Sequence, residues 1–166
     1  MPPKVAFYPC CYLDFIRPLE ILERYVDEVI FCDRDIKIAA KQQILIAQRP
    51  NIAPRARVRC GDARNVVKEI ERIDVLFYRR DGVGEGGSGL FVLGDSFLPD
   101  ILARFPASGG LIITDGSNSR GSNFKRMIRN NGLLKPGWRF NAQAEQPLLA
   151  TDGLYCIQVR PAGPHE

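Results

Sequence analysis

The sequence contains a single histidine, His165, close to its C-terminal end. A Ser-His-Asp or Cys-His catalytic set needs a well-placed imidazole, so hydrolytic sites of those kinds are excluded. The five cysteines include no C-x-x-C spacing, and with one histidine they offer no typical zinc ligand set. We therefore expect no metal site.

Long apolar runs are also missing. No stretch approaches the roughly 20 residues of a membrane span, and the opening MPPKVAF lacks the charged-then-apolar order of a signal peptide. We therefore expect a cytoplasmic protein with no membrane partner. Three of the five cysteines (Cys32, Cys60 and Cys156) lie in apolar, strand-like runs, which predicts reduced thiols packed as small hydrophobic groups.

The composition is that of an ordinary globular protein. The 166 residues, 45% of them hydrophobic and 25% charged, predict one domain over 1–166. The net charge is +4, with arginine concentrated in 49–64 and basic residues in 120–139. A solvated surface is the favoured interpretation of these clusters, and contact with nucleic acid is the alternative.

Short apolar runs alternate with stretches of helical spacing along the chain. Strands are predicted at 5–7, 28–32, 57–60, 73–78 and 110–114. Helices are predicted at 15–25, from Asp35 to before Pro50, at 63–70, from Asp95 or Ser96 to Phe105, and at 124–128. The second of these helices has Ile36, Ala40, Ile44 and Ala47 as its apolar side. Gly132 is predicted to end the last helix in the C′ position.

The C-terminal part predicts a β-hairpin. Its strands are GWRFN and GLYCIQV, linked by the polar stretch 142–152. Together with the five strand–helix alternations before it, this predicts a doubly wound α/β fold, a mostly parallel sheet of about seven strands.

Aspartates follow each of the five parallel strands. The carboxyl ends of such strands share one edge, where ligands bind. Asp14, Asp33, Asp62, Asp81 and Asp115 are therefore expected to converge on that edge.

Residues 82–89 are rich in glycine, which opposes regular structure. A phosphate-binding loop needs Lys-Ser/Thr after its last glycine, and a dinucleotide fingerprint must follow the first strand. Neither condition is met, so a lid over the site and plain disorder remain the two interpretations.

This order of elements, with an acidic residue after the second strand, Gly-Asp-Ala after the third and GLIITDG at the fifth, resembles the class I S-adenosylmethionine-dependent methyltransferases. The resemblance implies a Rossmann-like methyltransferase fold over nearly the whole chain, with S-adenosylmethionine as cofactor. It implies that Asp33, with Arg34 beside it, holds the ribose, and that Asp62 and Ala63 contact the adenine.

The first turn departs from that family, in which it is usually glycine-rich. Here it reads Tyr8-Pro9-Cys10-Cys11-Tyr12-Leu13-Asp14. It is similar to a methyltransferase-like pattern in which Tyr-Pro-Gly-Ser-Gly precedes an Asp, with cysteines and a tyrosine in place of the glycines and serine. The resemblance implies that Tyr8, Pro9, Cys10 and Asp14 border the cofactor.

The resemblance also implies that the segment after the fourth strand faces the methyl acceptor. Arg79 and Arg80 would orient the acceptor, and Asp81 is a candidate general base. The acceptor, whether a small molecule or a macromolecule, is not specified by these residues.

Structural interpretations stand beside the functional ones. Asp33 and Asp14 also suit helix caps, and Asp62 suits a Gly-Asp turn. The adjacent Cys10 and Cys11 suit a reactive thiol pair or simple packing.

Two functions remain in contention. The first is a small S-adenosylmethionine-dependent methyltransferase. The second is a degenerate methyltransferase-like scaffold that has lost the cofactor and acts as a binding or interaction module, which the missing glycines favour.

Overall fold

The computed structural model describes residues 2–51, 54–81, 89–118, 123–134, 137–144 and 146–165. Its strands are β1 (Val5–Pro9), β2 (Glu28–Asp33), β3 (Arg55–Cys60), β4 (Val75–Tyr78), β5 (Gly110–Thr114), β6 (Gly132–Leu134), β7 (Trp138–Ala142) and β8 (Tyr155–Pro161). Its helices are α1 (Ile16–Leu22), α2 (Ile36–Ala47), α3 (Ala63–Val66), the 3₁₀ helix η1 (Val67–Glu69), α4 (Leu98–Leu102), α5 (Phe124–Arg129) and α6 (Pro147–Thr151).

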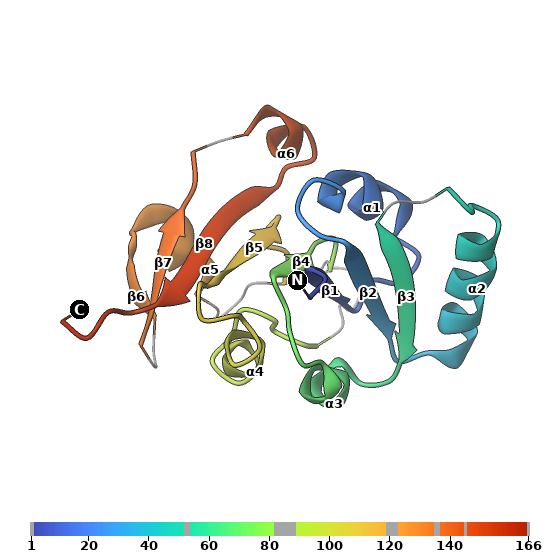
Figure 1. Ribbon diagram of the computed structural model, residues 1–166, viewed down its shortest axis with the longest axis horizontal. Coiled ribbons are helices and arrows are strands. Elements are labelled where there is room, and N and C mark those ends of the chain that lie inside the picture. The colour runs from blue at the N-terminus through green and yellow to red at the C-terminus, as the bar shows by residue number, and fades with distance from the viewer. Residues whose placement is uncertain are drawn as a thin grey trace.

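The strands form one sheet in the order β3-β2-β1-β4-β5-β8-β7-β6 (Figure 1). The first five strands in sequence pair in parallel, and β8 inserts antiparallel between β5 and β7. This confirms the doubly wound α/β fold, the mostly parallel sheet and the C-terminal hairpin. The described sheet has eight strands because the short β6 adds to β7.

Burial of the strands follows their place in the sheet. Every residue of β1 and β4 is buried, as expected for central parallel strands covered on both faces. At the edge, β3 instead exposes Arg55 and Arg57. Charged side chains on an edge strand discourage pairing with another chain.

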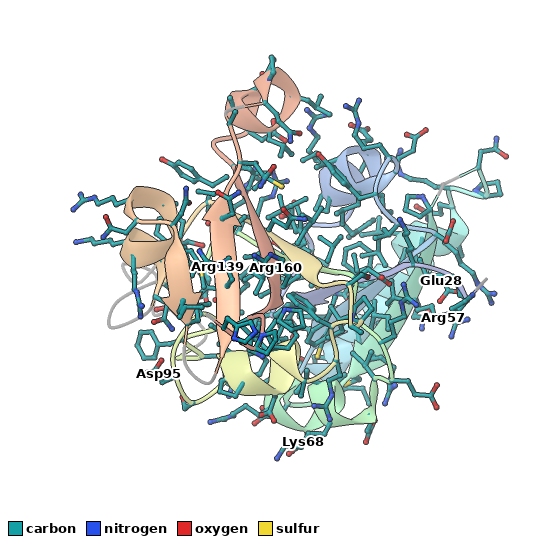
Figure 2. All side chains as sticks on the ribbon, turned by 60° about the vertical axis from the view of Figure 1, so that its left-hand side comes forward. Glu28, Arg57, Lys68, Asp95, Arg139 and Arg160 are labelled. Atoms are coloured by element: carbon teal, nitrogen blue, oxygen red, sulfur yellow. The ribbon has the colours of Figure 1, made fainter. Side chains whose placement is uncertain are left out.

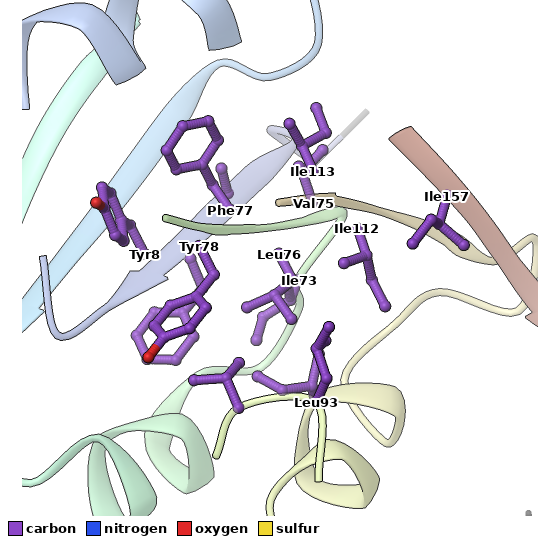
Figure 3. Packing of buried hydrophobic residues seen from close by; sticks show 14 of the residues in the cluster. Tyr8, Ile73, Val75, Leu76, Phe77, Tyr78, Leu93, Ile112, Ile113 and Ile157 are labelled. Atoms are coloured by element: carbon purple, nitrogen blue, oxygen red, sulfur yellow. The ribbon is translucent and has the colours of Figure 1, made fainter. Parts of the chain in front are cut away.

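Helices cover both faces of the sheet. In Figure 1, α3 and α4 lie below the strands, α1 lies above them, and α2 lies at the right beside β3. Figure 3 shows the resulting core around β4, with Phe77 and Ile113 on one side and Leu76 and Ile112 on the other. The ring of Tyr8 packs edge-on against the ring of Phe77, with 5.0 Å between the ring centroids. These fully buried side chains anchor the strand ends that carry the candidate site.

The predicted helices are found, but two details of α2 and α1 differ. Asp35 caps α2 as predicted, accepting the N–H of Lys37 at 2.9 Å. The buried side of α2, however, is Ile38, Ala39 and Gln42, whereas the predicted Ile36 and Ile44 are 73% and 59% exposed. The helix is apolar on more than one side, so spacing alone selected the wrong one. Helix α1 ends at Leu22, before the predicted Tyr25.

Two predicted helix boundaries are wrong. The N-cap of α4 is Phe97, with no side-chain cap, and the Asp95 carboxylate instead accepts the Asn123 amide at 3.1 Å. Gly132 is not a C′ residue, because α5 ends at Arg129 and Gly132 opens β6. Helix α6 occupies part of the stretch predicted to be a polar linker.

The glycine-rich stretch remains a prediction, because 82–88 lie outside the described residues. In the part of the chain that the structure describes, no helix combines the length and the apolar character needed to cross a membrane.

Candidate functional site at the carboxyl edge of the sheet

The turn after β1 has the backbone of a glycine turn without any glycine. Cys10 has φ of 55° and Tyr12 has φ of 50°. This left-handed region is uncommon for residues with a side chain and costs about 1–2 kcal/mol relative to the right-handed one. The two residues stand where the similar pattern has its glycines. The turn therefore has a glycine-type conformation at two residues that carry side chains.

The side chain of Gln42 supports this turn from α2. It is fully buried, and its Nε2 donates to the Tyr12 carbonyl and lies 3.1 Å from the Cys11 sulfur. Its Oε1 has no hydrogen-bond partner among the described residues. Sequence reasoning missed Gln42, and the only signal for it was its three- and four-residue spacing from Ala39 and Ile38.

The carboxylate of Asp33 lies beside the same turn. Its Oδ2 accepts the Tyr12 N–H at 3.2 Å, and its Oδ1 accepts the Asp35 N–H at 2.9 Å. Asp33 is therefore not the cap of α2, a role that Asp35 fills. The neighbouring Arg34 is exposed, and its carbonyl lies 3.8 Å from the Cys60 sulfur.

Asp62 caps α3 and is also held by an arginine. It accepts the Arg64 N–H at 2.9 Å, and the Arg64 guanidinium donates to both of its oxygens. The hydrogen bonds from the Arg64 side chain, followed by that from its backbone, lower the pKa of the Asp62 carboxyl. Ala63 follows as the buried first residue of α3.

Asp14 and Arg79 join the ends of β1 and β4. The guanidinium of Arg79 donates to both carboxylate oxygens at 2.7 and 2.8 Å and is only 2% exposed. Asp14 also accepts the Tyr8 hydroxyl at 2.7 Å. Burial, and then the negative charge of Asp14, raise the pKa of that hydroxyl, so it stays protonated and donating. Asp14 is thus not a helix cap, since Phe15 is the uncapped N-cap of α1, and its carboxylate is mostly buried.

The ion pair extends to the C-terminal part of the chain. Asp152, just after α6, lies 3.4 Å from Arg79 and accepts the Arg17 Nε at 2.7 Å. Nothing in the sequence pattern near Asp152 indicated this contact.

Asp81 and Asp115 complete the edge. Asp81 is buried and accepts hydrogen bonds from the Tyr78 hydroxyl and, at 3.0 Å, from the Asn118 amide. Asp115 accepts the Arg80 N–H at 3.0 Å, and Arg80 has φ of 59°. The Arg80 guanidinium is 68% exposed and lies 3.8 Å from Asp14.

The predicted convergence of aspartates is therefore present in the geometry. Asp33 contacts the first turn, Asp14 contacts the segment after β4, and that segment contacts Asp115. Gly61, next to Asp62, donates to the Asp33 carbonyl at 3.0 Å. The five carboxylates line one rim of the sheet, each with hydrogen-bond partners of its own.

The cysteines show no disulfide in the structure, and their burial is uneven. Cys11, Cys32 and Cys156 are buried, Cys10 is half-buried, and Cys60 is exposed, contrary to the packing predicted for it. Burial raises the pKa of Cys32 to about 12 and that of Cys156 to about 11. Among the residues that the structure describes, no group of histidine, cysteine or acidic side chains is arranged to hold a metal ion.

The first arginine cluster is largely paired. Arg57 contacts Glu28 at 3.1 Å, Arg59 contacts Glu69, and Arg64 contacts Asp62. These contacts favour the solvated-surface interpretation for that cluster. Arg120, at the start of the second cluster, lies outside the described residues.

Comparison with known proteins finds the likeness in structure only. No protein-family model matches the sequence, and no curated protein matches it. A methyltransferase from Geobacter sulfurreducens superposes with a TM-score of 0.60 at 12% identity, over 96% of this chain and 72% of that one. An rRNA methylase from Streptococcus thermophilus superposes with a TM-score of 0.56 at 13% identity, over 96% of this chain and 88% of that one. An O-methyltransferase from Bacillus cereus, solved in complex with SAH, superposes with a TM-score of 0.57 at 17% identity, over 97% of this chain and 74% of that one.

These likenesses extend over almost the whole chain. They establish the class I methyltransferase fold, and identities this low establish nothing finer. The structural neighbours just described are methyltransferases, one of them with SAH bound.

Proposed function

We propose that this chain is a methyltransferase that binds S-adenosylmethionine at the carboxyl ends of β1, β2 and β3. The observation that carries the proposal is the 3.2 Å contact between the Tyr12 N–H and the Asp33 carboxylate. It joins the two segments to which the resemblance assigns the methionine and ribose parts of the cofactor. Support also comes from the fold and from the SAH bound to a neighbour of the same fold.

The donor set at this rim fits the cofactor. A carboxylate has about four lone-pair sites, and within the described part of the chain each Asp33 oxygen accepts one N–H. Asp33 can therefore also accept ribose hydroxyls. The Asp62–Arg64 pair is 37% and 64% exposed, and an exposed pair of this kind opens at little cost, which frees Asp62 for an adenine amine. The side chain of Tyr12 is 60% exposed and does not pack into the protein.

When bound, the cofactor supplies an electrophilic methyl group, so the chain itself needs to position the acceptor rather than attack it. Arg79 is too buried to meet an acceptor directly, and in this proposal it fixes Asp14 and, through it, the first turn. Arg80 is exposed at the same rim and orients the acceptor. Asp81, held by Tyr78 and Asn118, is the candidate base for the proton that the acceptor releases, and because it is buried this role requires the rim to open at Asp81.

Calorimetry with S-adenosylmethionine and S-adenosylhomocysteine tests the proposal. We expect saturable heat with both ligands at high micromolar concentrations. The absence of heat for both would remove the proposal.

Variants of two aspartates at the two ends of β2 locate the site. Asp33→Asn removes the charge at the carboxyl end of β2 and should weaken binding about tenfold, the typical value of a hydrogen bond to a charged group. Asp27→Asn, just before the other end of β2, is the matched control, because Asp27 is exposed and its carboxylate accepts the Lys4 N–H at 2.8 Å, away from the rim. Equal weakening in both variants would contradict the proposed location.

A second function, that of a cofactor-free scaffold, is favoured by Cys10 and Tyr12. Side chains stand at the two positions whose backbone is of glycine type, where the cofactor approaches closely in the family that the chain resembles. If the native chain does not bind S-adenosylmethionine but the double variant Cys10→Gly with Tyr12→Gly does, the result supports the scaffold function. Binding by the native chain excludes it.

A further inference from the structure

A pocket of about 550 Å³ lies between α5, α6 and the adjoining ends of β7 and β8. This volume is within the range of about 300–1,000 Å³ that is typical of sites for a whole small molecule. Tyr155, the first residue of β8, lines the pocket and pairs with Thr114, the residue before Asp115. The pocket therefore adjoins the carboxyl edge of the sheet, on the far side of β5 from the proposed cofactor site.

The wall of this pocket is largely apolar. Helix α5 contributes Ile128, α6 contributes Leu149 and Ala150, and Leu154 comes just before β8. Leu149 and Leu154 belong to the hydrophobic core and are buried. Such a wall favours a ligand with apolar surface, because burying that surface away from water is favourable.

Tyr155 gives the pocket an aromatic side. Its ring packs edge-on against the ring of Phe124, with 5.5 Å between the ring centroids, and the residue is nevertheless 48% exposed. A ring that is already held in place loses little conformational freedom when a second ring packs against it. This residue therefore favours an aromatic ligand.

No charged residue is found among the described residues that line the pocket. Arg139 and Arg160 lie directly opposite each other further along the β7–β8 pair, away from α6 (Figure 2). The Cys156 thiol is neutral, because burial raises its pKa to about 11. A charged ligand would lose its water here without gaining a counter-charge. The lining therefore favours a neutral ligand.

Two carboxamides add one acceptor and one donor to this lining. The Nε2 of Gln143 donates to the Asn141 carbonyl at 3.1 Å, which leaves the Oε1 of Gln143 as an acceptor. The Oε1 of Gln146 accepts the Tyr25 hydroxyl at 2.9 Å, which leaves the NH₂ group of Gln146 as a donor. A hydroxyl group both donates and accepts, so one hydroxyl on a ligand suits both carboxamides.

We propose that this pocket binds a neutral aromatic molecule that carries a hydroxyl group. The ring of the ligand packs against Tyr155 and the apolar wall, and its hydroxyl bonds to the carboxamides of Gln143 and Gln146. The site is independent of the proposed cofactor site, since neither Asp33 nor Asp62 lines it.

Titration with 2-naphthol at neutral pH, without S-adenosylmethionine and followed by ¹H–¹⁵N NMR, tests the proposal. We expect saturable shifts of the side-chain NH₂ signals of Gln143 and Gln146 and of the backbone N–H signal of Gly153. Naphthalene lacks the hydroxyl and should bind about fivefold more weakly, the typical value of a neutral hydrogen bond. The charged 2-naphthoate should bind more weakly than 2-naphthol as well.

Variants that fill the pocket locate the binding. Ala150→Phe places a ring in the pocket from α6 and should abolish the shifts. Thr151→Phe is the matched control, because it adds the same ring at the next position, which is exposed and outside the lining. If Ala150→Phe does not fold, Ala144→Trp fills the pocket from an exposed position after β7. Gln143→Leu should reduce the preference for 2-naphthol over naphthalene.

The proposal is overturned if 2-naphthol does not bind saturably, or if its shifts are confined to other parts of the chain. Equal loss of binding in Ala150→Phe and Thr151→Phe also overturns it, and equal affinity for 2-naphthol and 2-naphthoate contradicts a neutral ligand. Because the titration contains no cofactor, a failure here leaves the proposed methyltransferase function standing, and a failure to bind S-adenosylmethionine leaves this site standing.

Discussion

Arg79 and Asp14, 65 positions apart in the chain, form a two-bond ion pair that fastens the end of β4 to the turn after β1. The guanidinium is 2% exposed and the carboxylate 15% exposed. Because the guanidinium has left water, it depends for compensation on Asp14 and on Asp152, which lies 3.4 Å away. The pair therefore makes the candidate site rigid at the point where its two central strands meet.

Removing one partner of this pair should be costly. Asp14→Asn leaves the buried Arg79 guanidinium with Asp152, 3.4 Å away, as its remaining counter-charge. We expect a loss of about 1.5–3 kcal/mol in the free energy of unfolding, the value of a hydrogen bond to a charged group. Urea denaturation measures this loss. The double variant Asp14→Leu with Arg79→Met removes both charges and should recover most of it. A loss well under about 1 kcal/mol in Asp14→Asn would contradict this and show that Asp152 or water compensates the guanidinium.

Stability should fall at acid pH through Asp152. The hydrogen bond from Arg17, with a smaller contribution from Arg79, holds the pKa of the Asp152 carboxyl below its ordinary value of 3.8. The unfolded chain therefore takes up this proton at higher pH than the folded chain does. The stabilisation is complete above the pKa that Asp152 has in the unfolded chain. It is lost as the pH falls through the lower pKa that Asp152 has in the folded chain. Thermal unfolding from about pH 6 to about pH 2 should show a shallower acid decline for Asp152→Asn than for the native chain; identical declines would contradict this.

The thiols should react in an order set by burial. Only the thiolate is nucleophilic, and burial raises the pKa of Cys11, Cys32 and Cys156. Labelling of the native chain with a disulfide reagent near pH 8 should therefore modify Cys60 first and Cys10 next, with the other three reacting only on unfolding. Cys60→Ser should remove the fastest phase, and a fast phase that survives it would contradict the order.

The left-handed turn predicts a stabilising substitution. Glycine at Cys10 or Tyr12 removes a strain of about 1–2 kcal/mol and costs about 0.5–1 kcal/mol in chain entropy. Each variant should thus unfold at slightly higher urea concentration than the native chain. Leu13→Gly, at a residue without positive φ, is the control and should destabilise. Destabilisation by all three variants would mean that the Cys10 and Tyr12 side chains contribute packing that outweighs the strain.

Gly116 should not accept a side chain. It has φ of 76°, and a Cβ there would lie 2.2 Å from the buried ring of Phe124, which packs against Tyr155. Gly153 has nearly the same φ, 70°, with nothing within 4 Å. Gly153→Ala should therefore lose about 1–2 kcal/mol from backbone strain alone, and Gly116→Ala should lose about 1–3 kcal/mol more from crowding. Equal losses would show that Phe124 moves aside freely.

Local pattern determined the fold of this protein. Continuous apolar runs such as those of β2 and β5 specify buried parallel strands, and Asp35 specifies the start of α2, because both effects act within a few residues. The convergence of the aspartates at the strand ends could be predicted as well, because parallel strands have their carboxyl ends at one edge of the sheet.

The tertiary structure alone decided how those aspartates are used. Asp14 meets Arg79 and Asp152 meets Arg17 across long separations, and Gln42 comes under the first turn from another helix. No spacing rule encodes such partners, because they depend on how distant elements pack. For the same reason the sequence could not show that Cys10 and Tyr12 have a glycine-type backbone. The residue type indicates only which backbone conformation is preferred, and surrounding contacts are needed to hold a residue in a conformation that it disfavours.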